Sequence, residues 1–159
     1  LERTLEATTV RNEEMLYVSL IQQMCADFRC QKPVTLRIST IPFLIPNVAF
    51  VMNSQSSYHI VFDVRVYSAS TPQEIRAFLA HEMGHVYFMN RYGSDFGGRA
   101  YGGSQIDADN IAMQYVPPGN LLVAYQKHIL SFNPETRHRM DNILQRIGTL
   151  PQIPFKRRL

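Results

Sequence analysis

The chain has 159 residues, of which 45% are hydrophobic and 18% are charged, and its formal net charge is +3. This length and apolar content suit one globular domain over residues 1–159 and exclude a largely disordered chain. The net charge owes much to a basic tail at 151–159 and is too small to indicate nucleic-acid binding.

The first predicted elements are one helix and a small group of strands. Apolar residues at near-helical spacing predict an amphipathic helix from about 11 to 28. Alternation of apolar and polar residues, interrupted by turn-forming residues, then predicts three strands, over 34–38, near 48–52 and over 58–67.

Helices are predicted for the rest of the chain. Thr71-Pro72-Gln73-Glu74 is a capping box with proline at the first helical position, and the helix it begins should end near Tyr92. The stretch 92–103, rich in glycine and tyrosine, predicts a loop. Three more helices are expected over about 105–115, 120–131 and 134–147. This order predicts an α+β fold, in which a small sheet packs on a mostly helical domain.

Residues 81–85 read His-Glu-Met-Gly-His inside a predicted helix. Histidines four residues apart lie on the same helical face, so both imidazoles can bind one zinc ion at about 2.0–2.1 Å. Glu82 points into the same cleft, where it can take a proton from metal-bound water. The motif predicts His81 and His85 as zinc ligands and Glu82 as the general base. The competing interpretation is a pair of exposed histidines on an ordinary helix.

Gly84 lies inside this predicted helix, where glycine costs about 1 kcal/mol relative to alanine. We therefore expect that position to leave room for a neighbouring backbone or for substrate.

A zinc peptidase needs a third protein ligand and one open coordination position. The downstream candidates are Asp95, Gln105, Asp107 and Asp109. Gln105 and Asp109 are four residues apart and share one edge of the predicted helix. Asp107 lies about 200° around the helix from Gln105 and cannot easily reach the same metal.

Three segments resemble the HtpX-like gluzincin metallopeptidases, a group that includes the CAAX prenyl proteases and small periplasmic lipoprotein proteases. The segments read TPQEIRAFLAHEMGHVYF, QIDADNIAMQY and NPETRHRMDNIL. In that family, a Glu-x-x-Ala-Asp motif supplies the third zinc ligand and an aspartate that orients a zinc-bound histidine. The resemblance implies a zincin-like domain with zinc as its cofactor. It assigns the ligand position to Gln105 and the orienting position to Asp109.

Gln105 departs from the glutamate of this family. Its amide oxygen can bind a metal but brings no charge, so zinc should bind less tightly. Three interpretations remain open. Gln105 is the third ligand, or Asp109 replaces it on the metal, or Gln105 is an engineered substitution. Asp95, ten residues after His85, offers a further alternative because its context faintly resembles the aspzincin peptidases.

These observations predict a zinc metalloendopeptidase that hydrolyses protein or peptide substrates. An extended substrate should pair with the edge of the strand over 58–67. The alternative, favoured by Gln105, is a catalytically weak or silent pseudopeptidase that binds peptides and keeps the fold, with or without the zinc. A regulatory protease with a single dedicated target is a third hypothesis. Candidate donors to a tetrahedral oxyanion are Tyr101, Arg137, His138 and Arg139.

The location of the protein is predicted from the composition of its segments. No apolar run approaches the roughly 18 residues that a membrane span needs. Because the chain begins at Leu1 rather than Met, we expect a processed or trimmed chain, with any leader or membrane anchor upstream. The expected location is periplasmic or exported, with the cytoplasm as the alternative. Cys25 and Cys30 could pair in an oxidising compartment and would remain thiols in the cytosol.

Overall fold

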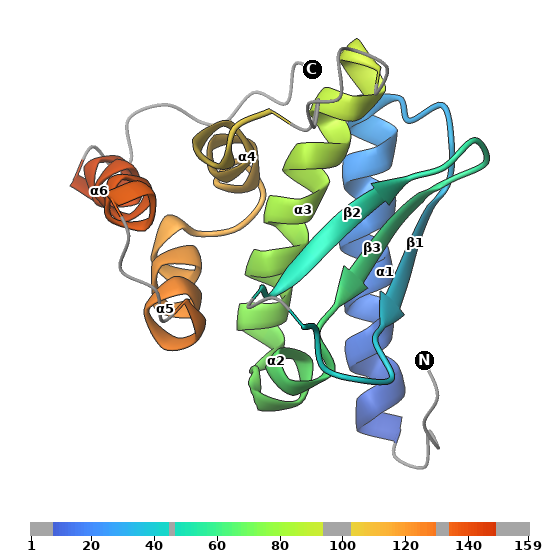
Figure 1. The fold of residues 1–159 in the computed structure, drawn as a ribbon, viewed down its shortest axis with the longest axis horizontal. Coiled ribbons are helices and arrows are strands. Elements are labelled where there is room, and N and C mark those ends of the chain that lie inside the picture. The colour runs from blue at the N-terminus through green and yellow to red at the C-terminus, as the bar shows by residue number, and fades with distance from the viewer. Residues whose placement is uncertain (1–7, 45–46, 94–102, 130–133, 149–159) are drawn as a thin grey trace.

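A computed structural model describes residues 8–44, 47–93, 103–129 and 134–148 and shows an α+β fold, as predicted (Figure 1). None of the helices in these ranges has the length and apolar character needed to cross a membrane. The elements are α1 (Thr8–Phe28), β1 (Val34–Ile38), β2 (Ala49–Asn53), β3 (Tyr58–Phe62), α2 (Val64–Ala69), α3 (Pro72–Tyr92), α4 (Gln105–Ala112), α5 (Pro118–His128) and α6 (Pro134–Gly148).

The three strands form one mixed sheet in the order β1-β3-β2. Strand β3 is parallel to β1 and antiparallel to β2, so hydrogen bonds occupy both of its edges. The predicted pairing of a substrate with this strand is therefore wrong, because the strand over 58–62 is central. Within the described residues, β2 is the edge strand that also contacts α3.

The third strand is shorter than predicted, because it ends at Phe62 rather than at 67. The buried carboxylate of Asp63 accepts hydrogen bonds from the backbone N–H groups of Arg65, at 2.7 Å, and Val66, at 3.4 Å. These bonds cap α2, so the alternation of Val64 and Val66 belongs to a short helix and not to a strand.

Helix α3 is the central element, contacting α1, α4, α5, β2 and β3. Figure 1 shows it between the sheet with α1 on one side and the group α4–α6 on the other. Its predicted start is confirmed, since the Thr71 side chain accepts from the Glu74 N–H at 3.2 Å and Glu74 accepts from the Thr71 N–H at 3.0 Å. The helix ends at Tyr92, as expected.

The other helices differ from the predictions only at their ends. Helix α4 starts after Ser104, as predicted, but stops at Ala112 because the next residues form tighter i to i−3 bonds, such as Tyr115 N–H to Ala112 C=O at 2.9 Å. Helix α5 begins two residues earlier than expected, at Pro118, since proline tolerates the first helical position.

Candidate metal centre

The His-Glu-Met-Gly-His motif lies in the middle of α3, where the helix is covered by other elements on several sides. His81 and Glu82 are only 5% and 6% exposed, and His85 is half-buried. The interpretation of these side chains as exposed residues on an ordinary helix is therefore wrong. Burying two imidazoles and a carboxylate has a free-energy cost unless other groups compensate for it, which makes their partners informative.

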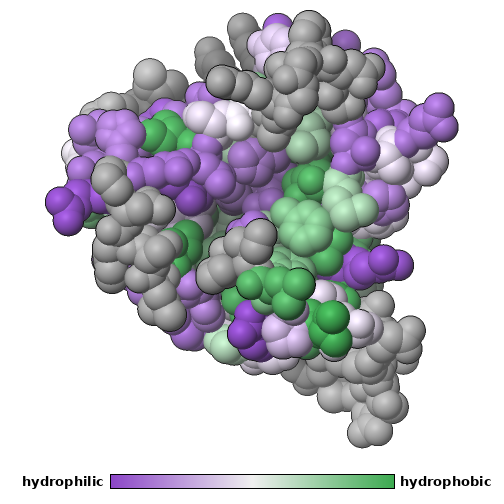
Figure 2. Space-filling model, viewed as in Figure 1, coloured by the Kyte–Doolittle hydropathy of each residue, from purple (hydrophilic) through white to green (hydrophobic). Residues whose placement is uncertain are grey.

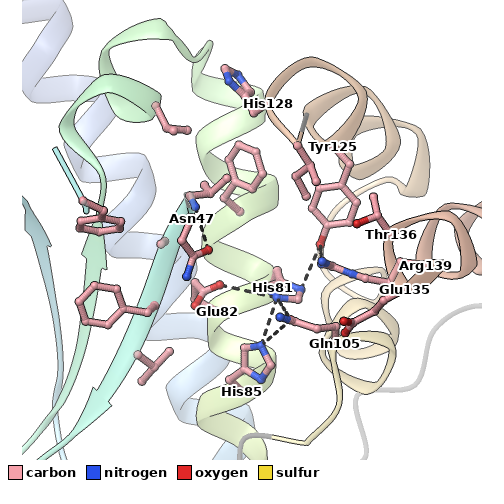
Figure 3. A pocket seen from close by; sticks show the side chains of 18 of the residues that line it. Asn47, His81, Glu82, His85, Gln105, Tyr125, His128, Glu135, Thr136 and Arg139 are labelled. Carbon is pink, nitrogen blue, oxygen red and sulfur yellow. Dashed lines mark hydrogen bonds and ion pairs between the residues drawn. The ribbon is translucent and has the colours of Figure 1, made fainter. Parts of the chain in front are cut away.

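Three potential ligand atoms converge beside α3. His81 Nε2 is 2.9 Å from Gln105 Oε1, His85 Nε2 is 3.0 Å from the same oxygen, and the two Nε2 atoms are 3.1 Å apart (Figure 3). Ligands at about 2.0–2.1 Å in a tetrahedral zinc site are separated by about 3.3 Å. The triangle formed by His81, His85 and Gln105 therefore fits a tetrahedral metal site after small movements of the side chains.

Asp109 lies on the opposite side of the His81 ring. Its Oδ1 is 2.7 Å from His81 Nδ1, so the imidazole donates its Nδ1–H to the carboxylate and directs the Nε2 lone pair toward Gln105. Asp109 is fully buried. The structure thus places Asp109 against Nδ1 of His81 and Gln105 against the Nε2 atoms of both histidines.

Two residues from later helices hold Asp109 in place. Arg139 of α6 donates from Nε to Asp109 Oδ2 at 3.0 Å and from Nη2 to Oδ1 at 3.2 Å. The Tyr125 hydroxyl of α5 donates to Asp109 Oδ1 and accepts from Arg139 Nη2 at 2.8 Å. Arg139 is a predicted candidate for the oxyanion donor, but its Nε and Nη2 groups donate hydrogen bonds to the buried carboxylate of Asp109. No pattern in the sequence pointed to Tyr125.

In this network Asp109 is ionised and Tyr125 is protonated. Burial by itself would raise the pKa of Asp109, but hydrogen bonds from His81 and Arg139 and the positive charge of Arg139 outweigh it and lower the pKa. The pKa of Tyr125 is raised, chiefly by burial and also by the Asp109 charge, so the phenol stays protonated and can donate. Asp109 is therefore an ionised acceptor for the His81 Nδ1–H.

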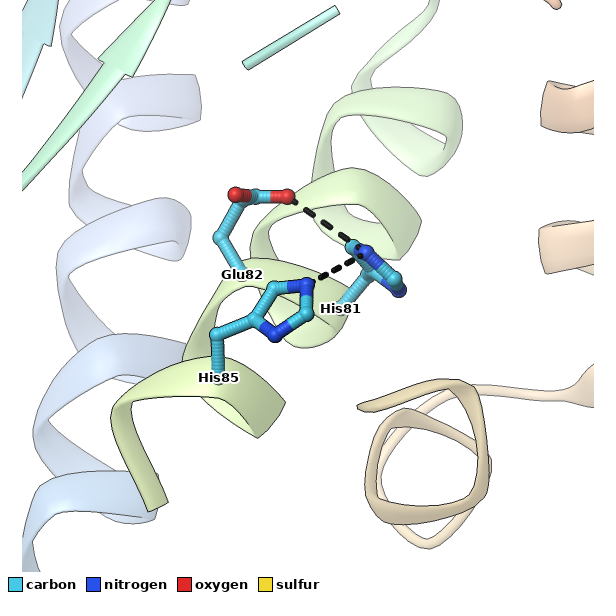
Figure 4. Close-up of side chains that lie close together, drawn as sticks. All are labelled: His81, Glu82 and His85. Atoms are coloured by element: carbon cyan, nitrogen blue, oxygen red, sulfur yellow. Dashed lines mark hydrogen bonds and ion pairs between the residues drawn. The ribbon is translucent and has the colours of Figure 1, made fainter. Parts of the chain in front are cut away.

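Glu82 lies beside the triangle without being part of it. Its Oε2 is 3.6 Å from His81 Nε2, and the ligand atoms of His81, Glu82 and His85 lie within 4.8 Å of one another (Figure 4). Burial raises the pKa of Glu82 to about 7. A cation bound nearby would oppose this shift, because it favours the charged carboxylate. In this position Glu82 can exchange a proton with a group held next to the two histidines.

The three motif residues line a pocket of about 1260 Å³ that is open on one side. One wall is largely apolar and includes Phe43, Val48, Phe50 and Val51, from β2 and the segments before it. The opposite wall comes from α4, α5 and α6. Figure 2 shows these walls as a hydrophobic surface over β2 and a hydrophilic surface toward α4 and α6.

Two predicted site candidates, Asp95 and Tyr101, lie outside the described part of the chain, as does the basic tail at 151–159. Asp107 caps the first turn of α4 instead, since its carboxylate accepts from the Ser104 N–H at 3.2 Å. Comparisons of the chain with protein-family models, curated proteins and solved structures found no match.

Gly84 lets α4 approach α3 closely enough for the triangle to form. A Cβ at this position would lie 2.6 Å from the backbone oxygen of Ala108 and 2.8 Å from its Cα. The expected neighbouring backbone is therefore that of α4. Since the obstructing atoms belong to a backbone, an added methyl group would force the two helices apart.

We therefore expect Gly84→Ala to lower the free energy of unfolding by about 1–3 kcal/mol and to weaken metal binding, because it moves Gln105 away from His81. Thermal unfolding and zinc titration measure the two effects. Gly119→Ala is the matched control, since a Cβ there would meet nothing within 4 Å and alanine favours the helix. Equal effects of both variants would contradict the packing argument.

Proposed function

We propose that this protein is a zinc-dependent metalloendopeptidase of the gluzincin type, with a zincin-like domain. The observation that carries the proposal is the convergence of His81, His85 and Gln105, with Glu82 next to them in an open pocket. Two imidazoles and one oxygen donor form a set that suits zinc and leaves a fourth position free. The resemblance of the motif segments to HtpX-like peptidases supports the same function.

The metal ligands, Glu82 and Asp109 have different roles in the proposed hydrolysis. Zinc held by His81, His85 and Gln105 would supply a Lewis acid that polarises the scissile carbonyl and lowers the pKa of a bound water. Glu82 takes the proton from the attacking water and passes it to the leaving amine. Asp109 keeps His81 in the tautomer whose Nε2 lone pair faces the site.

The pocket suggests how a substrate is held. Strand β2 has one edge that is unpaired within the described residues, and its residues Ala49, Phe50 and Val51 line the same pocket as Glu82. An extended peptide can add to this edge through backbone hydrogen bonds, so recognition depends on an exposed, unfolded segment. The apolar wall favours peptides with large hydrophobic side chains near the scissile bond.

Gln105 favours a second candidate function, a peptide-binding pseudopeptidase with little or no turnover. A neutral amide oxygen is a weaker zinc ligand than a carboxylate, and metal sites gain affinity from ligand charge. Glu82, by contrast, retains the position of a general base. Metal content and catalytic turnover, measured on the same sample, therefore separate the two functions.

The proposal is tested by incubating the zinc-loaded protein with casein and identifying the products by mass spectrometry. Peptides released at internal sites, in proportion to bound zinc and suppressed by a chelator, support the endopeptidase. Stoichiometric zinc with casein binding but without cleavage supports the pseudopeptidase instead. A protein that binds no zinc contradicts the endopeptidase, whereas casein binding without zinc and without cleavage agrees with the pseudopeptidase.

Gln105→Glu is expected to raise zinc affinity about tenfold or more, because an anionic oxygen replaces a neutral one with the same reach. Competition against a chromogenic chelator measures the affinity. Gln126→Glu adds the same charge at an exposed position of α5 and controls for long-range electrostatics. Unchanged affinity in Gln105→Glu, together with loss of zinc in Asp109→Asn, would show that Asp109 is the third ligand.

A further inference from the structure

The end of helix α1 has the hydrogen bonds of a Schellman motif. The Cys30 N–H donates to the Cys25 carbonyl at 3.0 Å, and the Arg29 N–H donates to the Ala26 carbonyl at 3.3 Å. Arg29, the residue before Cys30, has a φ of 55°, in the left-handed region. This combination of a six-to-one bond, a five-to-two bond and a left-handed residue defines the motif.

The motif brings the side chains of Cys25 and Cys30 together. The first and last residues of a Schellman motif usually make a hydrophobic contact across the helix end, and here both are cysteines. The two thiols are free and hydrogen-bond to each other. Both are half-buried against the edge of the hydrophobic core and remain accessible to small reagents.

We propose that Cys25 and Cys30 are a redox site, a dithiol that closes to an intramolecular disulfide by exchange with an external disulfide. The Cys25 thiolate attacks one sulfur of the external disulfide, which forms a mixed disulfide and expels one thiol. Cys30 then loses its proton and attacks the Cys25 sulfur, which expels the second thiol. Two protein thiols are oxidised, and one external disulfide is reduced to two thiols.

Cys25 is the first nucleophile because of its hydrogen bond. The bond from the Cys30 thiol lowers the pKa of Cys25 and so raises its thiolate fraction. Cys30, five residues later, lies at the other end of the same Schellman motif and is therefore placed to attack that sulfur. This inference does not depend on the proposed peptidase function.

The disulfide would reinforce a junction between α1 and α3. The Asn90 side chain of α3 donates to the Phe28 carbonyl at 3.2 Å and to the Arg29 carbonyl at 3.3 Å, and accepts from the Gln31 N–H at 2.9 Å. All three contacts lie within or next to the Schellman motif. Fixing the motif therefore stabilises the docking of the helix that carries the candidate metal centre.

The test measures how strongly the folded chain favours disulfide closure. The full-length protein is equilibrated in buffers of oxidised and reduced glutathione, with and without urea, quenched with N-ethylmaleimide and weighed by intact mass spectrometry. We expect the closure equilibrium to favour the disulfide at least about tenfold more in the folded than in the unfolded chain. By thermodynamic linkage, the oxidised protein should also melt at a higher temperature.

Equal or weaker closure in the folded chain would overturn the proposal, as would two stable glutathione adducts without closure. Substitutions at Arg29, which is exposed, test the geometry. Arg29→Gly permits the left-handed conformation and should keep the folded-state preference. Arg29→Val disfavours that conformation and should reduce the preference at least about threefold. An unreduced preference in Arg29→Val would show that the Schellman motif does not organise the pair.

Discussion

Glu82→Gln is expected to lower turnover at least about a hundredfold while zinc binding stays nearly unchanged, because Glu82 acts as the general base and not as a ligand. Glutamine has the size of glutamate and can hydrogen-bond, but it cannot accept the proton of the attacking water. Single-turnover kinetics on a peptide substrate and zinc content of the same preparation measure the two effects.

The control for this variant is Asp141→Asn, which removes a carboxylate at an exposed position of α6, outside the pocket. It should keep the activity of the parent protein. If the parent cleaves peptides and Glu82→Gln cleaves them equally well, the assignment of the base is wrong. If Glu82→Gln also loses its zinc, then Glu82 contributes to metal binding directly.

His81→Ala and His85→Ala are expected to abolish stoichiometric zinc binding and the gain in melting temperature that zinc provides. A ligand that binds only the folded state stabilises it by RT ln(1 + [L]/Kd), which is about 2.7 kcal/mol at a hundredfold excess over Kd. Atomic absorption and thermal unfolding, each with and without zinc, are the measurements. Zinc retained by the double variant would place the metal elsewhere.

His81→Ala should have a second effect that is visible in zinc-free protein. Its imidazole is a buried partner of Asp109, at 2.7 Å, so its removal should cost about 1–3 kcal/mol even without metal. His138→Ala is the control, because it deletes an exposed imidazole of α6. A zinc-free His81→Ala protein as stable as the parent would contradict the proposed hydrogen-bond network.

The elements that were predicted well are those whose ends depend on nearby residues. The capping box of Thr71 and Glu74 starts α3 through contacts three residues apart, and Ser104 starts α4 in the same way. The strand over 34–38 and the α+β class were also predicted correctly. The error at Asp63 arose because one side chain turned an alternating sequence into a helix.

The sequence by itself determined the local geometry of the motif, since a helical repeat puts His81 and His85 on one face wherever α3 lies. Only the tertiary structure decided which groups meet them. Gln105 contacts His81 because Gly84 allows α4 to pack closely against α3. Asp109 is bound by Tyr125 of α5 and Arg139 of α6. The tertiary structure also decides the order of the strands, which makes β2 the edge strand beside the pocket. The side-chain contacts of His81 and Asp109 with the later helices join residues 16 to 30 positions apart, and no local hydrogen bond or periodic pattern encodes such pairings.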